Sequence, residues 1–560
     1  MIFPSASRWS RWTAALVAPV IVATLLPTFA VAQTTTPTPV PPRIRLVLQL
    51  TVDQMRGDYI DRYKSQYTGG LKWLSDHGAF FTNATHDHAA TETAPGHATL
   101  GSGRYPSHTG IVRNAAGVQD PQEPLLLGSK GGGASPFRFR GSALFDWIRS
   151  DNEWSQALSV SRKDRGAILP LGRAHQNVYW YGLDGNFTTS RYYADTMPGW
   201  VTRFNARQMF HSYLGQSWNL LLPASAYAEA DSQKIESSGK DFMFPHKLDP
   251  DVKKALEGFA DMPWMDEITA AFALNGVNEL KLGLGNGTDV LAMSLSTTDA
   301  VGHRYGPDSR ELHDQLLRLD RTLGKFLDSL FVLRDSSTII MALSADHGVT
   351  PYPALHFPGT DSLRGKVNIK PLMDATRSRL IALGVEGDVI DFESGMIVLD
   401  RGRLRARGIN ADSVVRSLKA KWSALPGIQS VYRKEELPAL TASGNVIARR
   451  WLHAIPDNLE AVLTVSLKPY YYWSTVMNAT HGSPNQLDAW VPIVFAGPMF
   501  KPGRYSREVH TVDIAPTLAA ALGITPIERI DGKILREALR PLASVKSTES
   551  GSVRSSGSKK

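Results

Sequence analysis

The chain has 560 residues, of which 42% are hydrophobic and 20% are charged, a composition typical of a large globular protein. Its formal net charge is +8 without a dense Lys/Arg stripe, so we expect no nucleic-acid-binding domain. It contains no cysteine, which excludes disulfides, thiolate zinc sites and a cysteine nucleophile, and leaves His, Asp and Glu as metal ligands.

The N-terminal residues have the pattern of an export signal. Arg8 and Arg11 precede an uncharged apolar run that ends on Ala-Val-Ala at residues 30–32. We interpret residues 1–32 as a signal peptide and residues 33–42 as a Pro/Thr-rich linker, which predicts a periplasmic or secreted protein. No stable membrane span would remain after cleavage, although the run is also long enough for an uncleaved anchor.

Apolar runs that alternate with helical patterns follow the linker. Strands are predicted at residues 43–51, 79–82, 157–161, 177–181, 289–297, 337–344 and 490–497. Helices are predicted around residues 71–74, 142–149, 307–330 and 512–522, with further helices and loops in 198–285. This alternation predicts an α/β fold with a large central, mostly parallel sheet and helices on both faces.

Residues 43–543 are predicted to form one large folded domain. Within it, residues 359–468 carry helical and strand patterns of their own and are expected to form an inserted cap or subdomain. Residues 544–560 are rich in Ser and Lys, so we expect a disordered tail.

Three predicted strands lead into acidic residues, namely Asp53, Asp299 and Asp346. Histidines lie near two of them or in a Gly/Ser-rich loop: His303, His347 and His481. Ligands bind at the carboxyl ends of strands in open α/β sheets, and nitrogen and oxygen donors without thiols fit a pair of zinc-like ions. Each residue taken alone also fits a helix cap, a turn or a polar loop.

The segment Thr-Glu-Thr-Ala-Pro-Gly-His at residues 91–97 places a hydroxyl at the start of a short helix. Thr93 is expected to be the N-cap, with Pro95 in the first turn. Backbone N–H groups and the helix dipole attract a phosphate at such a position. A capped surface helix is the alternative interpretation of this segment.

Lys163 and Arg165 stand two positions apart on a segment that we expect to be extended and to lead into an apolar strand. Side chains two apart on a strand face the same side, and an ammonium beside a planar guanidinium suits a phosphate dianion. In a phosphate diester one of the phosphate oxygens is bonded to the second substituent, so Lys163 and Arg165 favour monoesters as substrates. A solvated basic turn is the alternative.

The order of these motifs resembles the alkaline phosphatase superfamily, and within it the PafA-like bacterial alkaline phosphatases with a threonine nucleophile. The motifs, from about residue 43 to 522, are VDQMR, TETAPGH, GIVRN, SRKDRGAI, TTDAVGH, SADHG and THGSP. The resemblance implies that Thr93 is the nucleophile and that Asn114, Lys163 and Arg165 contact the phosphoryl group. It implies two Zn²⁺ ions, one bound by Asp53, Thr93, Asp346 and His347, and the other by Asp299, His303 and His481.

The resemblance further implies an exported phosphomonoesterase of broad specificity that acts on phosphorylated small molecules through a phosphothreonine intermediate and serves phosphate scavenging. We expect a monomer. One alternative is a phosphodiesterase or nucleotide pyrophosphatase with the same metals and nucleophile; another is a non-catalytic exported protein that binds phosphate ligands. Thr91, Glu92 and His97 are interpreted as supporting structure.

Overall fold

The structure, a computed structural model, describes residues 43–128, 132–357, 365–475 and 479–540. The predicted signal peptide, linker and C-terminal tail lie outside these ranges. None of the helices within the ranges combines the length and the apolar character needed to cross a lipid bilayer.

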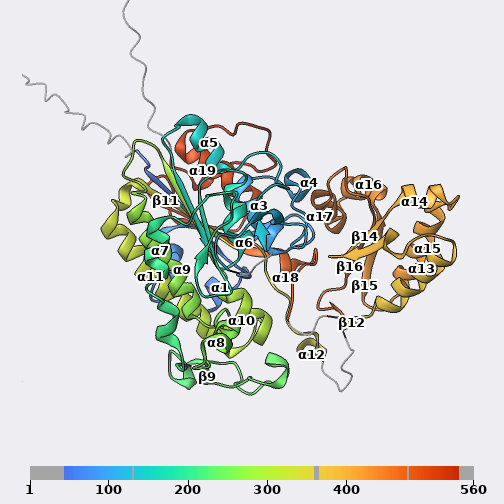
Figure 1. Cartoon of the computed structure of the whole chain (residues 1–560), viewed down its shortest axis with the longest axis horizontal. Helices are drawn as coiled ribbons and strands as arrows, with labels where there is room; N and C mark the ends of the chain where they lie inside the picture. The colour runs from blue at the N-terminus through green and yellow to red at the C-terminus, as the bar shows by residue number, and fades with distance from the viewer. Residues whose placement is uncertain (1–42, 129–131, 358–364, 476–478, 541–560) are drawn as a thin grey trace, which may run out of the picture. The chain divides into compact units, whose positions relative to one another are not determined.

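A sheet of 10 strands forms the centre of the fold (Figure 1). Its order is β19-β2-β18-β11-β1-β10-β5-β6-β7, and β20 also pairs with β2. β1 is parallel to β10 and β11, β10 is parallel to β5, and β5 is parallel to β6, whereas β18 is antiparallel to β11 and β2. The prediction of a mostly parallel central sheet is therefore confirmed. The strands are β1 Leu46–Val52, β2 Ala79–Thr85, β5 Ala157–Ser161, β6 Asn177–Tyr181, β7 Phe187–Thr188, β10 Asp289–Leu295, β11 Ile339–Ser344, β18 Trp490–Ala496, β19 Gly503–Tyr505 and β20 Val509–His510.

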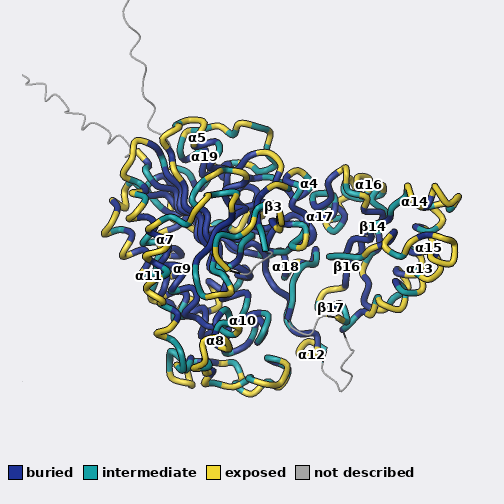
Figure 2. The backbone as a smooth tube through the Cα atoms, viewed as in Figure 1, coloured by how far each residue is buried: buried dark blue, intermediate teal, exposed yellow. Residues whose placement is uncertain are grey.

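The central strand β1 illustrates why both faces of the sheet are covered. Leu46 and Leu48 belong to one apolar cluster and Val47 to another, because successive side chains of a strand point to opposite faces. Helices α2 Gly70–His77, α9 Trp264–Glu279 and α11 Arg310–Leu333 contribute to the first cluster. Helices α3 Thr93–Ser102, α5 Leu144–Asp151, α6 Asp164–Ile168 and α19 Ile514–Leu522 contribute to the second. The central strands β1, β10 and β11 are accordingly drawn as buried in Figure 2.

Three local predictions are wrong by a few residues. Thr93 is the first helical residue of α3 rather than its N-cap, since the extended Glu92 precedes it at φ −122°. Asp299 does not end a strand but lies in the first turn of α10 Thr297–Tyr305. The apolar run after Lys163 forms α6 and a 3₁₀ turn instead of a strand, because a short buried run has no periodicity that separates the two.

Residues 366–473 contain a second sheet, which Figure 1 draws in orange. Its order is β13-β14-β16-β15, and all of its pairings are antiparallel. The fully buried Trp422 belongs to an apolar cluster that spans residues 367–467, so this region has a core of its own. The elements are β13 Ile390–Glu393, β14 Met396–Leu399, β15 Ile428–Arg433, β16 Ala461–Leu467, α13 Lys370–Ala382, α14 Arg401–Ala406, α15 Ala411–Ser423, α16 Leu437–Ala442 and α17 Val446–Ala454. The predicted subdomain limits of about 359–468 stay a prediction.

Candidate active site

Asp53, Asp346 and His347 form a group that we call the inner cluster. Asp53 directly follows β1, and the other two lie just beyond the end of the neighbouring parallel strand β11. Parallel strands bring their carboxyl ends to one edge, so residues far apart in the sequence meet there. All three residues are 0% exposed, and Asp53 Oδ1 lies 3.5 Å from His347 Nε2.

The inner cluster fits a divalent cation. Asp53 Oδ1 and His347 Nε2 are both buried without a hydrogen-bond partner among the described residues, although unpaired buried polar atoms are costly. Burial lowers the pKa of His347 to about 4, which keeps its imidazole neutral and able to coordinate. Burial, reinforced by the carboxylates of Asp299 and Asp346, raises the pKa of Asp53, so a cation in this place would relieve the repulsion.

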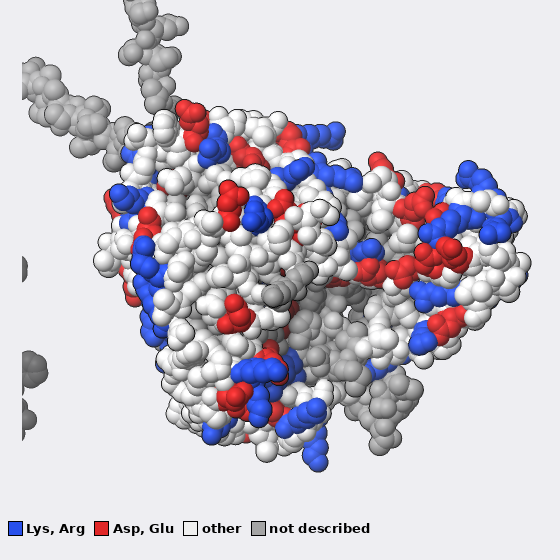
Figure 3. Space-filling model, viewed as in Figure 1, with Lys and Arg blue, Asp and Glu red and all other residues white. Residues whose placement is uncertain are grey.

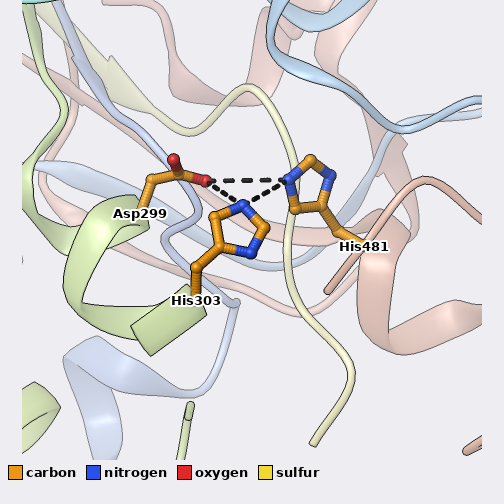
Figure 4. A group of neighbouring side chains, drawn as sticks. All are labelled: Asp299, His303 and His481. Atoms are coloured by element: carbon orange, nitrogen blue, oxygen red, sulfur yellow. Dashed lines mark hydrogen bonds and ion pairs between the residues drawn. The ribbon is translucent and has the colours of Figure 1, made fainter. Parts of the chain in front are cut away.

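Asp299, His303 and His481 form a second group, which we call the outer cluster (Figure 4). Asp299 and His303 lie one turn apart on α10, and their side chains converge with His481 from a loop. Asp299 Oδ1 is 3.3 Å from His303 Nε2 and 3.6 Å from His481 Nε2, and the two imidazole nitrogens are 3.2 Å apart. The His303 side chain is 32% exposed, so this cluster is reachable from solvent.

The electrostatics of the outer cluster also suit a cation. Burial opposes ionisation of Asp299, but Lys163 and His303 outweigh it and hold its pKa well below the usual range. Burial and the neighbouring imidazoles lower the pKa of His481 well below the usual range, so this ring is a neutral donor. One carboxylate with two imidazoles is a donor set that zinc accepts in proteins.

Lys163 connects the two clusters. Its Nζ atom lies 2.6 Å from Asp53 Oδ2 and 2.7 Å from Asp299 Oδ2. The same atom lies 3.3 Å from the hydroxyl oxygen of Thr93. With 7% exposure the residue is buried, so its charge is held beside the candidate nucleophile with little screening by water.

Thr93 and Asn114 are brought together at the N-terminus of α3. The Ala94 N–H donates to Asn114 Oδ1 at 2.8 Å, and the Asn114 N–H donates to Glu92 Oε2 at 2.7 Å. These bonds fix the Asn114 side chain beside Thr93. The Thr93 hydroxyl does not cap the helix and is directed at Lys163 instead.

Arg165 lies on α6, in the wall of a cavity of about 300 Å³ that Lys163 also lines. Its side chain is 28% exposed, and its only ion pair within the described residues joins its guanidinium to Asp164 at 3.5 Å. The extended geometry expected for Lys163 and Arg165 is wrong, because the helix begins between them. Both side chains nonetheless reach the same cavity.

Two further residues support the clusters, namely His97, which is predicted from the sequence to be supporting structure, and Gln54, which is not identified from the sequence. His97 Nδ1 lies 3.2 Å from Asp346 Oδ2, and its Nε2 lies 2.9 Å from Ser294 Oγ. Gln54 joins both clusters, since its backbone N–H donates to Asp346 Oδ1 at 3.1 Å and its Nε2 donates to Asp299 Oδ1 at 2.9 Å. The sequence feature that indicates a role for Gln54 is its position next to Asp53, and the one for His97 is its position one helical turn after Thr93.

Glu92 and Thr91 support the site from the loop before α3. Glu92 accepts hydrogen bonds from Asn114 and from the Ser394 hydroxyl, which belongs to the β13–β14 turn. In the same turn Glu393 forms an ion pair of 2.8 Å with Arg113. The Thr91 carbonyl lies 2.7 Å from His481 Nδ1 and fixes the orientation of that ring. The second sheet therefore contacts the residues that position Asn114.

Comparison with known proteins places this chain in a family. Residues 47–483 match the family described as type I phosphodiesterase / nucleotide pyrophosphatase. Alkaline phosphatase PhoV of Synechococcus elongatus is 29% identical over 89% of this chain and 93% of its own length. Alkaline phosphatase PhoK of Sphingomonas sp is 30% identical over 88% of this chain and 90% of its own length.

A crystal structure of the alkaline phosphatase PafA, a protein of Elizabethkingia meningoseptica, superposes with a TM-score of 0.81 at 27% identity, covering 89% of this chain and 99% of that one. A second PafA structure is of a variant substituted at a threonine, an asparagine, a lysine and an arginine. Their spacings, 21 positions for the first two and two for the last two, equal those from Thr93 to Asn114 and from Lys163 to Arg165. The chain belongs to the type I phosphodiesterase / nucleotide pyrophosphatase family, within the alkaline phosphatase superfamily, and is a phosphoric ester hydrolase.

Proposed function

We propose that this chain is an exported alkaline phosphatase, periplasmic or secreted, that hydrolyses phosphate monoesters of many small molecules and supplies inorganic phosphate. Three proteins that align with this chain over nearly their whole length, PhoV, PhoK and PafA, are named alkaline phosphatases, which supports this activity. The monomeric state and the absence of nucleic-acid binding remain predictions of the same proposal.

The two clusters are proposed to hold one Zn²⁺ each, with the Thr93 hydroxyl completing the inner set. The orphaned buried atoms Asp53 Oδ1 and His347 Nε2 support this assignment for the inner cluster. When bound, the ions supply Lewis-acid chemistry that favours the ionised hydroxyl and offsets charge on the departing oxygen.

The reaction of the chain itself proceeds in two displacements. In the first, Thr93 Oγ forms a bond to phosphorus, the ester P–O bond breaks, and the alcohol departs. In the second, water attacks the phosphothreonine and releases inorganic phosphate, which restores the Thr93 hydroxyl. Asn114 accepts from the Ala94 N–H through Oδ1, which leaves its Nδ2 group to donate to a phosphoryl oxygen.

The position of Lys163 is the single observation that carries the choice of monoesters. Its ammonium lies 3.3 Å from the nucleophile and touches a carboxylate of each cluster, so it can contact a non-bridging oxygen in the transition state. A monoester dianion presents one more anionic oxygen than a diester does. A buried cation beside the nucleophile therefore stabilises monoester transfer more strongly.

A comparison of an aryl phosphate monoester with its methyl diester tests the proposal. We expect the wild type to prefer the monoester and Lys163→Ala to lower kcat/KM for the monoester by about 10²- to 10³-fold, as for loss of one oxyanion donor. The value of kcat/KM for the diester should fall much less. A preference for the diester that Lys163→Ala leaves unchanged would overturn the assignment.

A phosphodiesterase or nucleotide pyrophosphatase activity is the second candidate, because the matched family is described by those activities. It uses the same nucleophile and the same two clusters. The assay above decides between the two, since a diesterase would hydrolyse the methyl diester faster than the monoester in the wild type.

A further inference from the structure

Two cavities reach the active site, and Arg162 lies in the wall of both. One has a volume of about 650 Å³ and is lined by Asp299 and His303 of the outer cluster. The other, of about 300 Å³, is lined by Lys163 and Arg165. A substrate phosphoryl group held between the clusters can extend its ester substituent into one of these spaces, and Arg162 borders each.

Arg162 lacks a hydrogen-bond partner in the described part of the chain. Its Nε atom is buried and unpaired, and neither terminal nitrogen makes a hydrogen bond or an ion pair with a described residue. A guanidinium has five N–H donors in a planar fork, and leaving such donors unsatisfied near the protein interior is unfavourable. The guanidinium of Arg162 therefore has N–H donors available for a ligand.

Arg304 in the wall of the larger cavity provides the contrast. Its guanidinium is fully engaged, with Asp241 at 2.7 Å, Ser237 at 3.0 Å and Asp261 at 3.2 Å. Burial raises the pKa of Asp261, and the charges of Arg304 and Arg162 partly offset that rise. Asp261 is thus already bonded to Arg304, so Arg162 keeps its donors for another anion.

We propose that Arg162 binds an anionic group on the alcohol or phenol portion of the substrate. This inference rests on the proposed phosphatase function and adds a substrate class, namely phosphate monoesters whose leaving group carries a carboxylate or similar anion. Planar guanidinium matches such oxygens in a bidentate manner. Because Arg162 and Lys163 line the same cavity, the two cations can contact the two ends of one substrate.

The test uses two pairs of aryl monoesters. Carboxyphenyl phosphates, substituted at the meta or para position, are compared with their neutral carboxamide analogues, which have nearly the same shape. We expect the wild type to favour at least one carboxylate over its carboxamide by about tenfold or more in kcat/KM. Arg162→Met should lower that ratio to about one, and Arg162→Lys, which keeps the charge, should retain part of it.

Arg173→Met is the matched control, because Arg173 is exposed and lines neither cavity. This variant should keep the wild-type ratio. A wild-type ratio near one for both pairs, or a ratio that Arg162→Met leaves unchanged, would overturn the inference. An equal loss on both members of a pair would overturn it too, since Arg162 would then act on the phosphoryl group or on folding. Failure of the proposed function has a different signature: none of the monoesters would be hydrolysed.

Discussion

The inner and outer clusters use the same kinds of donor but are built on different supports. The inner residues follow the ends of two adjacent strands in the middle of the sheet and are fully buried. The outer residues come from one turn of α10 and a loop, and His303 is 32% exposed on its side chain. The inner cluster is therefore enclosed, whereas the outer cluster borders a cavity that, under the proposed function, can admit leaving groups of different shape.

The largest expected effect concerns Thr93, the proposed nucleophile. Under the proposed function Thr93→Ala removes the oxygen that forms the covalent bond, so we expect kcat/KM to fall on the order of 10⁴-fold or more. The loss is measured by the steady-state release of phosphate from an aryl monoester. Thr99→Ala is a control on the same helix, because the Thr99 hydroxyl has no hydrogen-bond partner among the described residues. Near-normal turnover by Thr93→Ala would show that another residue is the nucleophile.

A matched pair of ligand substitutions tests the comparison directly. His347→Asn removes a donor in the enclosed cluster, and His303→Asn makes the same change in the open one. We expect a loss of about 10³-fold for His347→Asn, equivalent to several kcal/mol, and a smaller loss for His303→Asn, since water can take the vacated position. Kinetics together with zinc content per chain measure the pair. A larger loss for His303→Asn would reverse the proposed difference.

The rate at which a chelator removes metal should differ between the two clusters. Because the outer cluster is reachable from solvent, we expect a chelator to remove its ion first and the inner ion more slowly, with activity lost in the first phase. Zinc added back should restore activity. Zinc content followed over time in the wild type and in His303→Asn provides the measurement, and the variant should keep only the slow phase. A single phase in the wild type would contradict unequal access.

The smallest expected effects come from the supporting residues. His97→Gln weakens the contact with Asp346, and Gln54→Met removes a hydrogen bond to Asp299, so each should lower zinc affinity or activity by about 10- to 100-fold. His97→Gln should act mainly on the slow phase of zinc loss and Gln54→Met on the fast phase. If His97→Gln changed the fast phase and Gln54→Met the slow phase, the link between each residue and its cluster would be wrong. The same would hold if the variants only destabilised the fold and left zinc affinity unchanged.

The sequence predicted the parts of the site that stand at the ends of recognisable strands. Asp53 and Asp346 follow buried runs, and the parallel sheet then requires that they meet. Side chains that act through contacts across the fold have no such local pattern. His97 is one residue of an ordinary helix, and only the close approach of α3 to the backbone of Asp346 shows that it reaches that carboxylate.

The local geometry around Lys163 was the weakest prediction of the site. A short apolar run after a basic pair fits a strand or a helix equally well. The helix α6 forms because it packs Ala167 and Ile168 into the second apolar cluster of the core. The placement of Lys163 between two carboxylates depends on residues 53 and 299, which no spacing within the segment can reveal.

The pairing of β2 ties the segment before Thr93 to the C-terminal part of the chain. Within the described residues this strand, which leads to Thr93, pairs only with β18, β19 and β20, all from the C-terminal part of the chain. Contacts of such long sequence separation slow folding, because the intervening loop must be closed before they form. A chain made N-terminus first therefore cannot pair this strand within the sheet until residues 490–510 have been made. The N-terminal half alone thus lacks the partners that hold the segment before Thr93 in the sheet.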